Sequence, residues 1–472
     1  MGADEICFLS ARGMSAEIRS GRLSAREAVV AHLTRIERVN PKLNAIVTLT
    51  ADRAMKQAAA ADESQARGEF TGPLHGLPVG HKDLQDTAGI LTTYGSKVFR
   101  DHVPERDSPL VECLKKAGAI AIGKTNTPEF GAGSQTFNEV FGVTRNPYDL
   151  AKTCGGSSGG AAVALACNMI PLADGSDMGG SLRNPASFCN VVGMRTSPGF
   201  AAQWPALTGW STLGVEGPMA RTVSDAAFFL SAMAGPDPRC PVSTKEAGSQ
   251  FEKPLDRDFK GVRVAWFKDL GGLPFDSRVR EVVDAQRCTF DALGCVVEEA
   301  EPDFAGADEA FRIIRAALFH MGLGGLTPEQ LRLVKESVVS EIERGGRLDA
   351  VTLARAGSLR TQLYFRIREF LERYEFFVLP TSQVPPFDVS EQWVKQIAGV
   401  EMETYIDWMR SCYYISVVGS PALAVPAGFT AEGLPVGLQI VGRHTDNWSV
   451  LQLGHAFEQV NGAGQRRPLP LH

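Results

Sequence analysis

The first part of the chain carries apolar residues at helical spacing. Ser24 and Glu27 are spaced as in a capping box, in which each side chain caps a backbone N–H at the start of a helix. Apolar residues then recur every three or four positions and so share one face: Val29, Leu33 and Ile36. The helix is expected to stop at Asn40-Pro41, because a residue before proline avoids the helical conformation. A second, alanine-rich helix is predicted over 51–66.

After residue 66, short apolar runs alternate with segments of helical pattern. Strands are predicted over 119–123, 169–173, 261–267 and 375–380, and helices over 159–166 and 278–293. Ser108-Pro109 is predicted to begin another helix, which Gly118 closes. The last two apolar runs, 421–429 and 434–442, are separated by a short link and are predicted to form a hairpin.

This alternation favours an α/β fold, and the hairpin makes its sheet mixed instead of purely parallel. We predict a single large domain over 66–472 with a central mixed β-sheet covered by helices on both faces. Residues 1–65 are predicted to form a helical N-terminal arm that packs on this domain.

Composition and charge exclude several classes of protein. The 472 residues include 48 Lys and Arg against 54 Asp and Glu, a formal net charge of −6. This mild acidity argues against nucleic-acid binding, which needs a basic face. The nine cysteines are scattered without C-x-x-C spacing or a histidine cluster, so a metal site is not expected.

A membrane protein is not expected either. No apolar run approaches the roughly 18 residues that a membrane-spanning helix needs. Asp4 and Glu5 stand where a secretory signal peptide would carry positive charge. We therefore expect a cytoplasmic monomer or homodimer that acts on a small molecule, without a membrane or nucleic-acid partner.

Two short matches to well-known motifs do not fit their surroundings. Residues 118–125, GAIAIGKT, match the phosphate-loop pattern but follow a predicted helix and form an apolar strand pattern. Residues 154–160, CGGSSGG, match the G-x-S-x-G nucleophile elbow around Ser157 or Ser158, but a polar segment precedes them where a strand is required. Nucleotide binding and a Ser-His-Asp triad are therefore disfavoured.

A glycine-rich segment and a lysine indicate a different chemistry. Gly179-Gly180-Ser181 lacks bulk near a predicted helix start, where several backbone N–H groups can converge on a developing oxyanion. Lys82 follows the apolar stretch LPVG and is expected to be at least partly buried. Burial disfavours the ammonium form, so the pKa falls and the neutral amine can accept a proton from a serine hydroxyl. A tight turn and a solvated lysine are the structural alternatives.

Taken together, these segments resemble the amidase signature family. The matching stretches are 76–96, 123–142, 155–166, 175–199, 213–227 and 433–442. The resemblance covers nearly the whole chain and is densest over about 73–230. It implies acyl transfer through an acyl-enzyme, with no metal or organic cofactor.

The resemblance also implies roles for individual residues. Lys82 takes the place of the base, Ser157 that of a bridging serine that follows an unusual cis peptide, and Ser181 that of the nucleophile. The backbone N–H groups implied for the oxyanion hole are those of Met178, Gly179, Gly180 and Ser181. Ser157 stands 24 residues before Ser181, which is typical of the family and selects it over Ser158. His81 is disfavoured as a base, because neighbours on an extended segment point to opposite sides.

The expected substrate is a small hydrophobic or aromatic amide, anilide or carbamate, which corresponds to aryl-acylamidase or urethanase activity. The residues predicted to contact it are Gly155, Gly156, Trp204, Trp210 and Tyr414, with Trp408 and Tyr413 as further aromatic candidates. The alternative is that these aromatic rings belong to the core. Met178 stands where the family usually has threonine, which leaves the N–H but removes a hydroxyl. Arg183 either binds a substrate carboxylate or pairs internally with Asp174 or Asp177.

Two other functions stay open. The same residues would serve in the A-type subunit of a tRNA-dependent glutamine amidotransferase, which needs partner subunits. A non-enzymatic binding or scaffold protein of the same fold is the second alternative. The intact set of Lys82, Ser157 and Ser181 argues against it.

Overall fold

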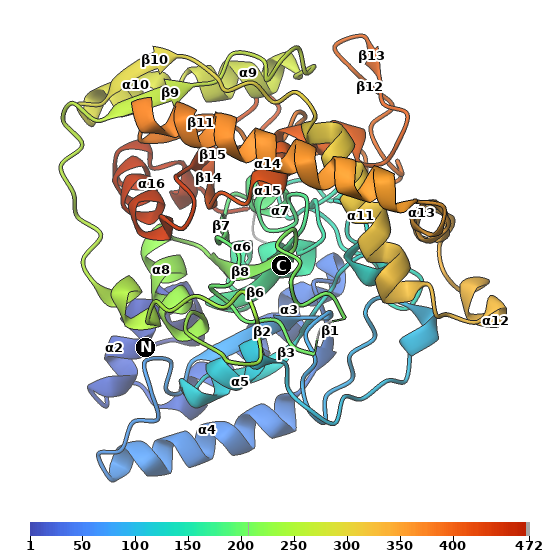
Figure 1. The fold of residues 1–472 in the computed structure, drawn as a ribbon. Helices are drawn as coiled ribbons and strands as arrows, with labels where there is room; N and C mark the ends of the chain where they lie inside the picture. The colour runs from blue at the N-terminus through green and yellow to red at the C-terminus, as the bar shows by residue number, and fades with distance from the viewer. Residues whose placement is uncertain (206, 469–472) are drawn as a thin grey trace.

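A computed structural model describes residues 1–205 and 207–468, and within them an 11-stranded sheet runs through the molecule (Figure 1). The strand order is β1-β3-β2-β6-β8-β7-β14-β15-β11-β9-β10. These strands are β1 (Ile46–Leu49), β2 (Pro78–Lys82), β3 (Ile120–Thr125), β6 (Leu172–Asp177), β7 (Val192–Arg195), β8 (Val215–Ala220), β9 (Arg263–Trp266), β10 (Val296–Glu299), β11 (Phe376–Pro380), β14 (Ala422–Phe429) and β15 (Pro435–Val441). β2 is parallel to β3 and β6, whereas β14 and β15 form the predicted antiparallel hairpin, so the mixed sheet is confirmed.

Helices flank the sheet, and two short strand pairs lie outside it (Figure 1). The helices are α1 (Ala3–Phe8), α2 (Ala11–Arg19), α3 (Ala25–Leu43), α4 (Ala51–Ala66), α5 (Pro109–Lys116), α6 (Gly159–Ala166), α7 (Arg183–Cys189), α8 (Val223–Met233), α9 (Ser277–Asp284), α10 (Arg287–Ala292), α11 (Ala307–Leu323), α12 (Pro328–Leu331), α13 (Glu336–Gly346), α14 (Ala350–Arg373), α15 (Arg410–Val418) and α16 (Asn447–Asn461). The small pairs are β4 (Phe137–Asn138) with β5 (Gly142–Val143), and β12 (Gln396–Ile397) with β13 (Val400–Glu401). The predicted α/β class is therefore confirmed.

The centre of the sheet is buried on both sides, which explains its apolar sequence. Every residue of β2, β3, β7, β11 and β15 is buried, as expected for strands with helices on both faces. α6 is buried at all its positions and packs against β2, β3 and β6. A Cβ atom on Gly160 would lie 2.3 Å from the backbone nitrogen of Asn126, so only glycine allows this close approach. The start of α6 is thereby fixed against the strands.

The N-terminal segment is more closely joined to the sheet than a purely helical arm would be. α4 spans the predicted range, and α3 has the predicted capping box of Ser24 and Glu27. α3 does not stop at Asn40-Pro41 but continues to Leu43, because a proline in the last turn removes few helical hydrogen bonds. Between these helices the segment also supplies β1, which pairs antiparallel with β3 at the edge of the sheet.

Two further predictions are corrected. The strand expected over 169–173 begins only at Leu172, because Pro171 has no N–H to donate to a neighbouring strand, and it extends to Asp177. The helix expected over 278–293 is divided into α9 and α10, where Gln286 N–H donates to the Val283 carbonyl three residues back and tightens the turn. The predicted helices over 109–117 and 159–166 are confirmed within one residue.

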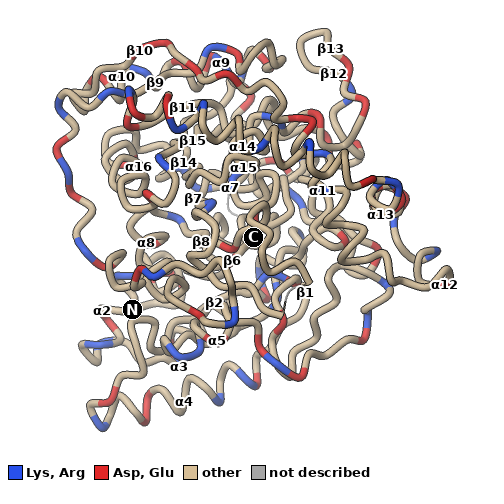
Figure 2. Tube along the Cα trace, in the orientation of Figure 1, with Lys and Arg blue, Asp and Glu red and all other residues tan. Residues whose placement is uncertain are grey.

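The surface charges are mixed. Figure 2 shows acidic and basic residues side by side along the outer helices α4 and α13. Among the described residues, no helix combines the length and the apolar character needed to cross a bilayer.

Candidate active site

Lys82 is the last residue of β2 and is fully buried, as the apolar stretch before it predicted. Its Nζ lies 2.7 Å from Ser157 Oγ and 2.9 Å from Ser176 Oγ, and it hydrogen-bonds both. Its backbone N–H donates to Asp174 Oδ1 at 2.8 Å, which fixes the end of the strand. Among the described residues Lys82 forms no ion pair, so two hydroxyl groups are the nearest partners of its amine.

The surroundings of Lys82 favour its neutral form. Burial lowers the pKa of Lys82 to about 8, although the carboxyl groups of Glu216, Asp177 and Asp174 act in the opposite direction. A substantial fraction of the amine is therefore unprotonated in mildly alkaline solution. In that form its lone pair can accept the Ser157 hydroxyl proton.

Ser157 lies in the turn just before α6, and the peptide bond between Gly156 and Ser157 is cis. The neighbouring Ser158 is the N-cap residue of α6, and its hydroxyl lies 3.5 Å from the Ser176 carbonyl oxygen. Its N–H donates to the Ser181 carbonyl at 3.1 Å, which ties the two serine-bearing loops together. The structure thus brings Ser157, and not Ser158, to the lysine.

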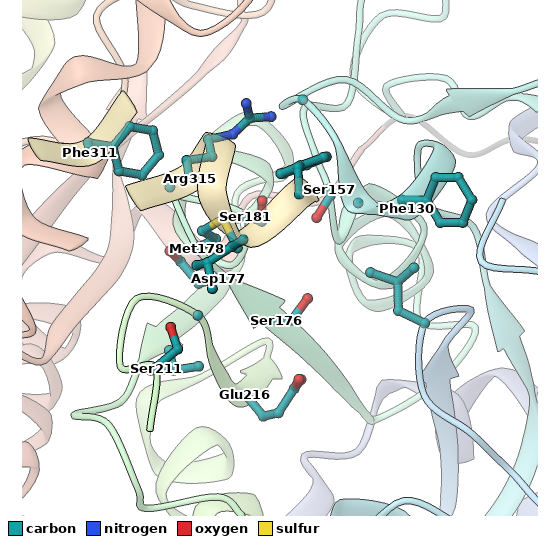
Figure 3. A pocket seen from close by; sticks show the side chains of 18 of the residues that line it. Phe130, Ser157, Ser176, Asp177, Met178, Ser181, Ser211, Glu216, Phe311 and Arg315 are labelled. Carbon is teal, nitrogen blue, oxygen red and sulfur yellow. The ribbon is translucent and has the colours of Figure 1, made fainter. Parts of the chain in front are cut away.

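Ser181 lies in the turn that joins β6 to α7, and its side chain faces the same cavity as Ser157 (Figure 3). Gly180 has a φ of 120°, and a Cβ atom there would lie 2.6 Å from Asn184 and Cys412 atoms. A Cβ atom on Gly179 would lie 2.9 Å from the ring of Phe311. Gly180 therefore requires glycine, and Gly179 leaves room for the Phe311 ring.

The four N–H groups predicted for the oxyanion hole are not equivalent. Gly180 N–H donates to Asp177 Oδ1 at 2.8 Å and is therefore occupied, which departs from the prediction. Among the described residues, the N–H groups of Met178, Gly179 and Ser181 have no hydrogen-bond acceptor. Unpaired N–H groups beside a nucleophile are the donors that a developing oxyanion requires.

A buried ion-pair network holds this turn in place. Asp177 Oδ2 lies 3.0 Å from Arg183 Nε, and Asp177 Oδ1 lies 3.2 Å from Arg195 Nη1. Burial alone would raise the pKa of Asp177, but the two guanidinium groups hold it well below its usual value. Arg183 is fully buried in this network, so the internal ion pair is the alternative that the structure selects. Its partner is Asp177 and not Asp174.

His81 has a carboxylate partner. Its Nδ1 lies 2.5 Å from Asp174 Oδ2 in the buried interior. Among the described residues, neither Ser157 nor Ser181 hydrogen-bonds the His81 ring, whereas the Lys82 amine contacts Ser157.

The two serines open onto a cavity of about 310 Å³ with two different walls (Figure 3). One wall is apolar and is formed by Phe130, Met178, Phe311, Leu318, Phe319, Ile406 and Met409. The other is polar and is formed by Ser176, Gln203, Thr208, Ser211 and Glu216. The cavity can therefore receive a ligand with an apolar part and a polar part.

The residues predicted to contact substrate do not line this cavity. Trp210 is 79% exposed, and the Arg239 guanidinium lies over the Trp204 ring. Tyr414 packs against Phe304 with ring centroids 5.5 Å apart. The other two aromatic candidates pack on other rings: Trp408 stacks on Phe188, and Tyr413 stacks on Phe311. The two glycine candidates lie against backbone, Gly155 against Pro185 and Gly156 against Gln135. The aromatic content of the sequence did not indicate which rings the fold turns toward the serines.

Two residues of the polar wall escaped the sequence analysis. Ser176 accepts from Lys82, and Glu216 accepts hydrogen bonds from Gln85 Nε2 at 2.6 Å and Gln203 Nε2 at 3.2 Å. Alternation along β6 could have placed Ser176 on the face that Asp174 shares, two residues earlier. Glu216 carries no such signal, because its position depends on how β8 pairs with β6.

Comparison with known proteins identifies relatives along nearly the whole chain. A model of the amidase family matches residues 27–451. An acylamidase from Rhodococcus erythropolis is 35% identical over 471 residues, which cover 99% of this chain and 98% of the relative. The A subunit of a glutamyl-tRNA(Gln) amidotransferase from Carboxydothermus hydrogenoformans is 34% identical over 490 residues, covering 98% and 99% of the two chains. Among solved structures, a bacterial aryl acylamidase superposes with a TM-score of 0.92 at 27% identity and covers 98% of this chain and 100% of its own.

Proposed function

The chain belongs to the amidase signature family, whose members hydrolyse carbon–nitrogen bonds, and from this premise we propose that it cleaves small amides through an acyl-enzyme on Ser181. It is an amidase, a hydrolase of non-peptide carbon–nitrogen bonds. The observation that carries the proposed mechanism is the 2.7 Å contact between Lys82 Nζ and Ser157 Oγ, beside the cavity that Ser181 lines.

In the first half of the proposed reaction, neutral Lys82 accepts the proton of Ser157, and Ser157 accepts that of Ser181. Ser181 Oγ attacks the amide carbonyl carbon and forms a tetrahedral intermediate. The N–H groups of Met178, Gly179 and Ser181 are the donors available to its oxyanion, and one such donor typically contributes 10²–10³ in rate. The relay returns a proton to the leaving nitrogen, and the amine departs.

In the second half, a water molecule takes the place of the amine. The same relay removes a proton from this water, which attacks the acyl carbon on Ser181. The acid is released and Ser181 recovers its hydroxyl proton. The two halves use the same groups in reverse order, so the chain's own side chains and N–H groups suffice for every proton movement.

The apolar wall supports a hydrophobic or aromatic substrate: an amide, an anilide or a carbamate. Phe130, Phe311 and Phe319 offer ring surfaces that line the cavity, and Figure 3 shows Phe130 and Phe311 on opposite sides of Ser181. The similarity to an acylamidase and to an aryl acylamidase structure favours the same class. A cavity of about 310 Å³ is at the small end of ligand sites, so a small molecule is favoured over a polymer end.

Hydrolysis of a substrate panel by the purified single chain tests this proposal. The panel contains aliphatic amides, anilides, aryl carbamates and glutamine. We expect turnover of anilides or carbamates by the chain alone, and little release of ammonia from glutamine. Glutaminase activity that appears only when tRNA-binding partner subunits are added would instead assign the chain as an A-type amidotransferase subunit.

A further inference from the structure

Glu216 stands beside the proposed relay because of strand pairing. β6 and β8 are antiparallel neighbours, and in their register Ser176 is directly opposite Glu216. Residues directly opposite each other project from the same face of a sheet, with their Cβ atoms roughly 5 Å apart. Ser176 Oγ is also a partner of Lys82 Nζ, at 2.9 Å. Figure 3 shows Glu216 and Ser176 together on the polar wall of the cavity.

The carboxyl group of Glu216 has neutral partners only. It accepts from the side-chain amides of Gln85 and Gln203, and among the described residues it forms no ion pair. Burial raises the pKa of Glu216 to about 7, against the influence of nearby Lys82. Its negative charge, when present, is therefore uncompensated except by the lysine.

The other charged groups around the relay are already engaged. From β6, Asp174 accepts from His81 and from the Lys82 backbone, and Asp177 pairs with Arg183 and with Arg195 of β7.

Charged groups on the remaining elements are engaged as well. The ammonium of Lys124 on β3 hydrogen-bonds Thr87 and Thr92, and Asp83 accepts from Thr93. On the far wall, Arg315 lies 2.9 Å from Glu341. Among the described carboxyl groups that line the cavity, Glu216 is therefore the one without an arginine partner.

We propose that Glu216 is a positioning residue of the relay, which acts across Ser176 to hold the ammonium form of Lys82 until the solution becomes alkaline. This inference rests on the proposed role of Lys82 as the base. The carboxylate lowers the cost of a buried positive charge and so sets the pH at which the neutral amine becomes available. Glu216 need not touch the substrate to do this.

The test is the pH dependence of Ser181 reactivity in Glu216→Gln. The readout is the second-order rate of labelling by a serine-reactive fluorophosphonate probe, from about pH 6 to about pH 10, a range that brackets the pKa of Lys82. Above the Glu216 pKa of about 7, where the carboxylate is charged, we expect the acid limb of the profile to move down by up to about one pH unit, so labelling between about pH 7 and the midpoint rises by up to about tenfold. Glu216→Asp keeps the charge and should keep the limb near its original position.

Glu458→Gln is the matched control, because Glu458 is another half-buried carboxyl but accepts from the Val223 backbone N–H on α8, away from the cavity. It should leave the profile unmoved. The inference would be overturned if folded Glu216→Gln kept the acid limb of its labelling profile in place or moved it to higher pH. A variant that changed only the KM for substrate, with no change in this profile, would also overturn it. Lys82→Ala separates the proposed relay from the proposed role of Glu216. Fast labelling of Ser181 in Lys82→Ala contradicts the relay itself. Slow labelling in Lys82→Ala, together with an unmoved profile in Glu216→Gln, contradicts only the role of Glu216.

Discussion

The two walls of the cavity are built in different ways. The polar wall and the proposed relay come from segments between β2 and β8, where hydrogen bonds hold Lys82, Ser176 and Glu216, and buried ion pairs hold the adjoining Asp177. The apolar wall comes mainly from α11 and from residues 406–409, which follow much later in the chain. The comparison teaches that the groups suited to chemistry are fixed by close, directional contacts, whereas the groups suited to selecting a substrate are held by packing.

The polar wall should tolerate almost no change at its nucleophile. Ser181→Ala removes the attacking oxygen, so we expect kcat/KM to fall by at least about 10⁴-fold with the fold intact. Ser158→Ala is the matched control, because Ser158 does not contact Lys82, and it should retain most activity. Rates for Ser181→Ala within tenfold of the original protein would refute the assignment of the nucleophile.

The ion-pair network should matter for stability as well as for activity. Asp177→Ala leaves Arg183 and Arg195 buried without their counter-ion, so we expect a loss of about 3–5 kcal/mol in the free energy of unfolding. Asp4, which pairs with Arg38 at the surface, is the control, and Asp4→Ala should cost less than about 1 kcal/mol. Denaturant unfolding measures both. Equal losses in the two variants would show that the polar wall is not held by this network.

The charge state of Lys82 should control the rate. Deprotonation produces the base, so kcat/KM should rise with pH, by about tenfold per unit well below the pKa of about 8, and level off above it. A pH profile measured with a slow, chemically limited amide tests this. A flat profile across that range would remove the lysine from its proposed role.

Substitutions in the apolar wall should have smaller effects, and these should be confined to substrate selectivity. Phe311→Leu removes a ring that lines the cavity, and we expect the preference for aryl over alkyl amides to fall by about tenfold. Trp210→Ala, at an exposed ring outside the cavity, should change this preference by less than about twofold. The ratio of kcat/KM for a matched aryl and alkyl pair is the measurement. If Trp210→Ala changed the preference more than Phe311→Leu did, the substrate contact predicted for Trp210 from the sequence would be supported instead.

The elements with strong local signals could be predicted from the sequence. The buried helix α6, the capped helix α5 and the β14–β15 hairpin appeared at their predicted places, because periodicity, caps and turn residues act over a few neighbouring positions. Pro41 and the 278–293 segment were placed less well. In the first case the proline falls in the last turn, where it removes few hydrogen bonds, and in the second the Gln286–Val283 hydrogen bond tightens the turn between α9 and α10.

The features of the site also divide into those that the sequence could predict and those that it could not. The burial of Lys82 was predictable from the apolar residues before it, whereas the contacts that require glycine at position 180 come partly from the distant Cys412. The internal pairing of Arg183 was foreseen as one of two alternatives. The occupation of the Gly180 N–H by Asp177 and the identity of the aromatic wall were not, since both depend on where distant side chains arrive.

By itself, the sequence determined which chemistry is possible. It has a lysine after an apolar stretch and two serines in glycine-rich segments, which suit acyl transfer, and it has no surplus of positive charge for binding nucleic acid. Only the tertiary structure decided that Arg183 and Arg195 both pair with Asp177, and that Glu216 lies across from Ser176. The physical reason is range. Burial tendency and backbone freedom are properties of a few successive residues, whereas a hydrogen bond or a strand register is settled by groups that the chain brings together from far apart.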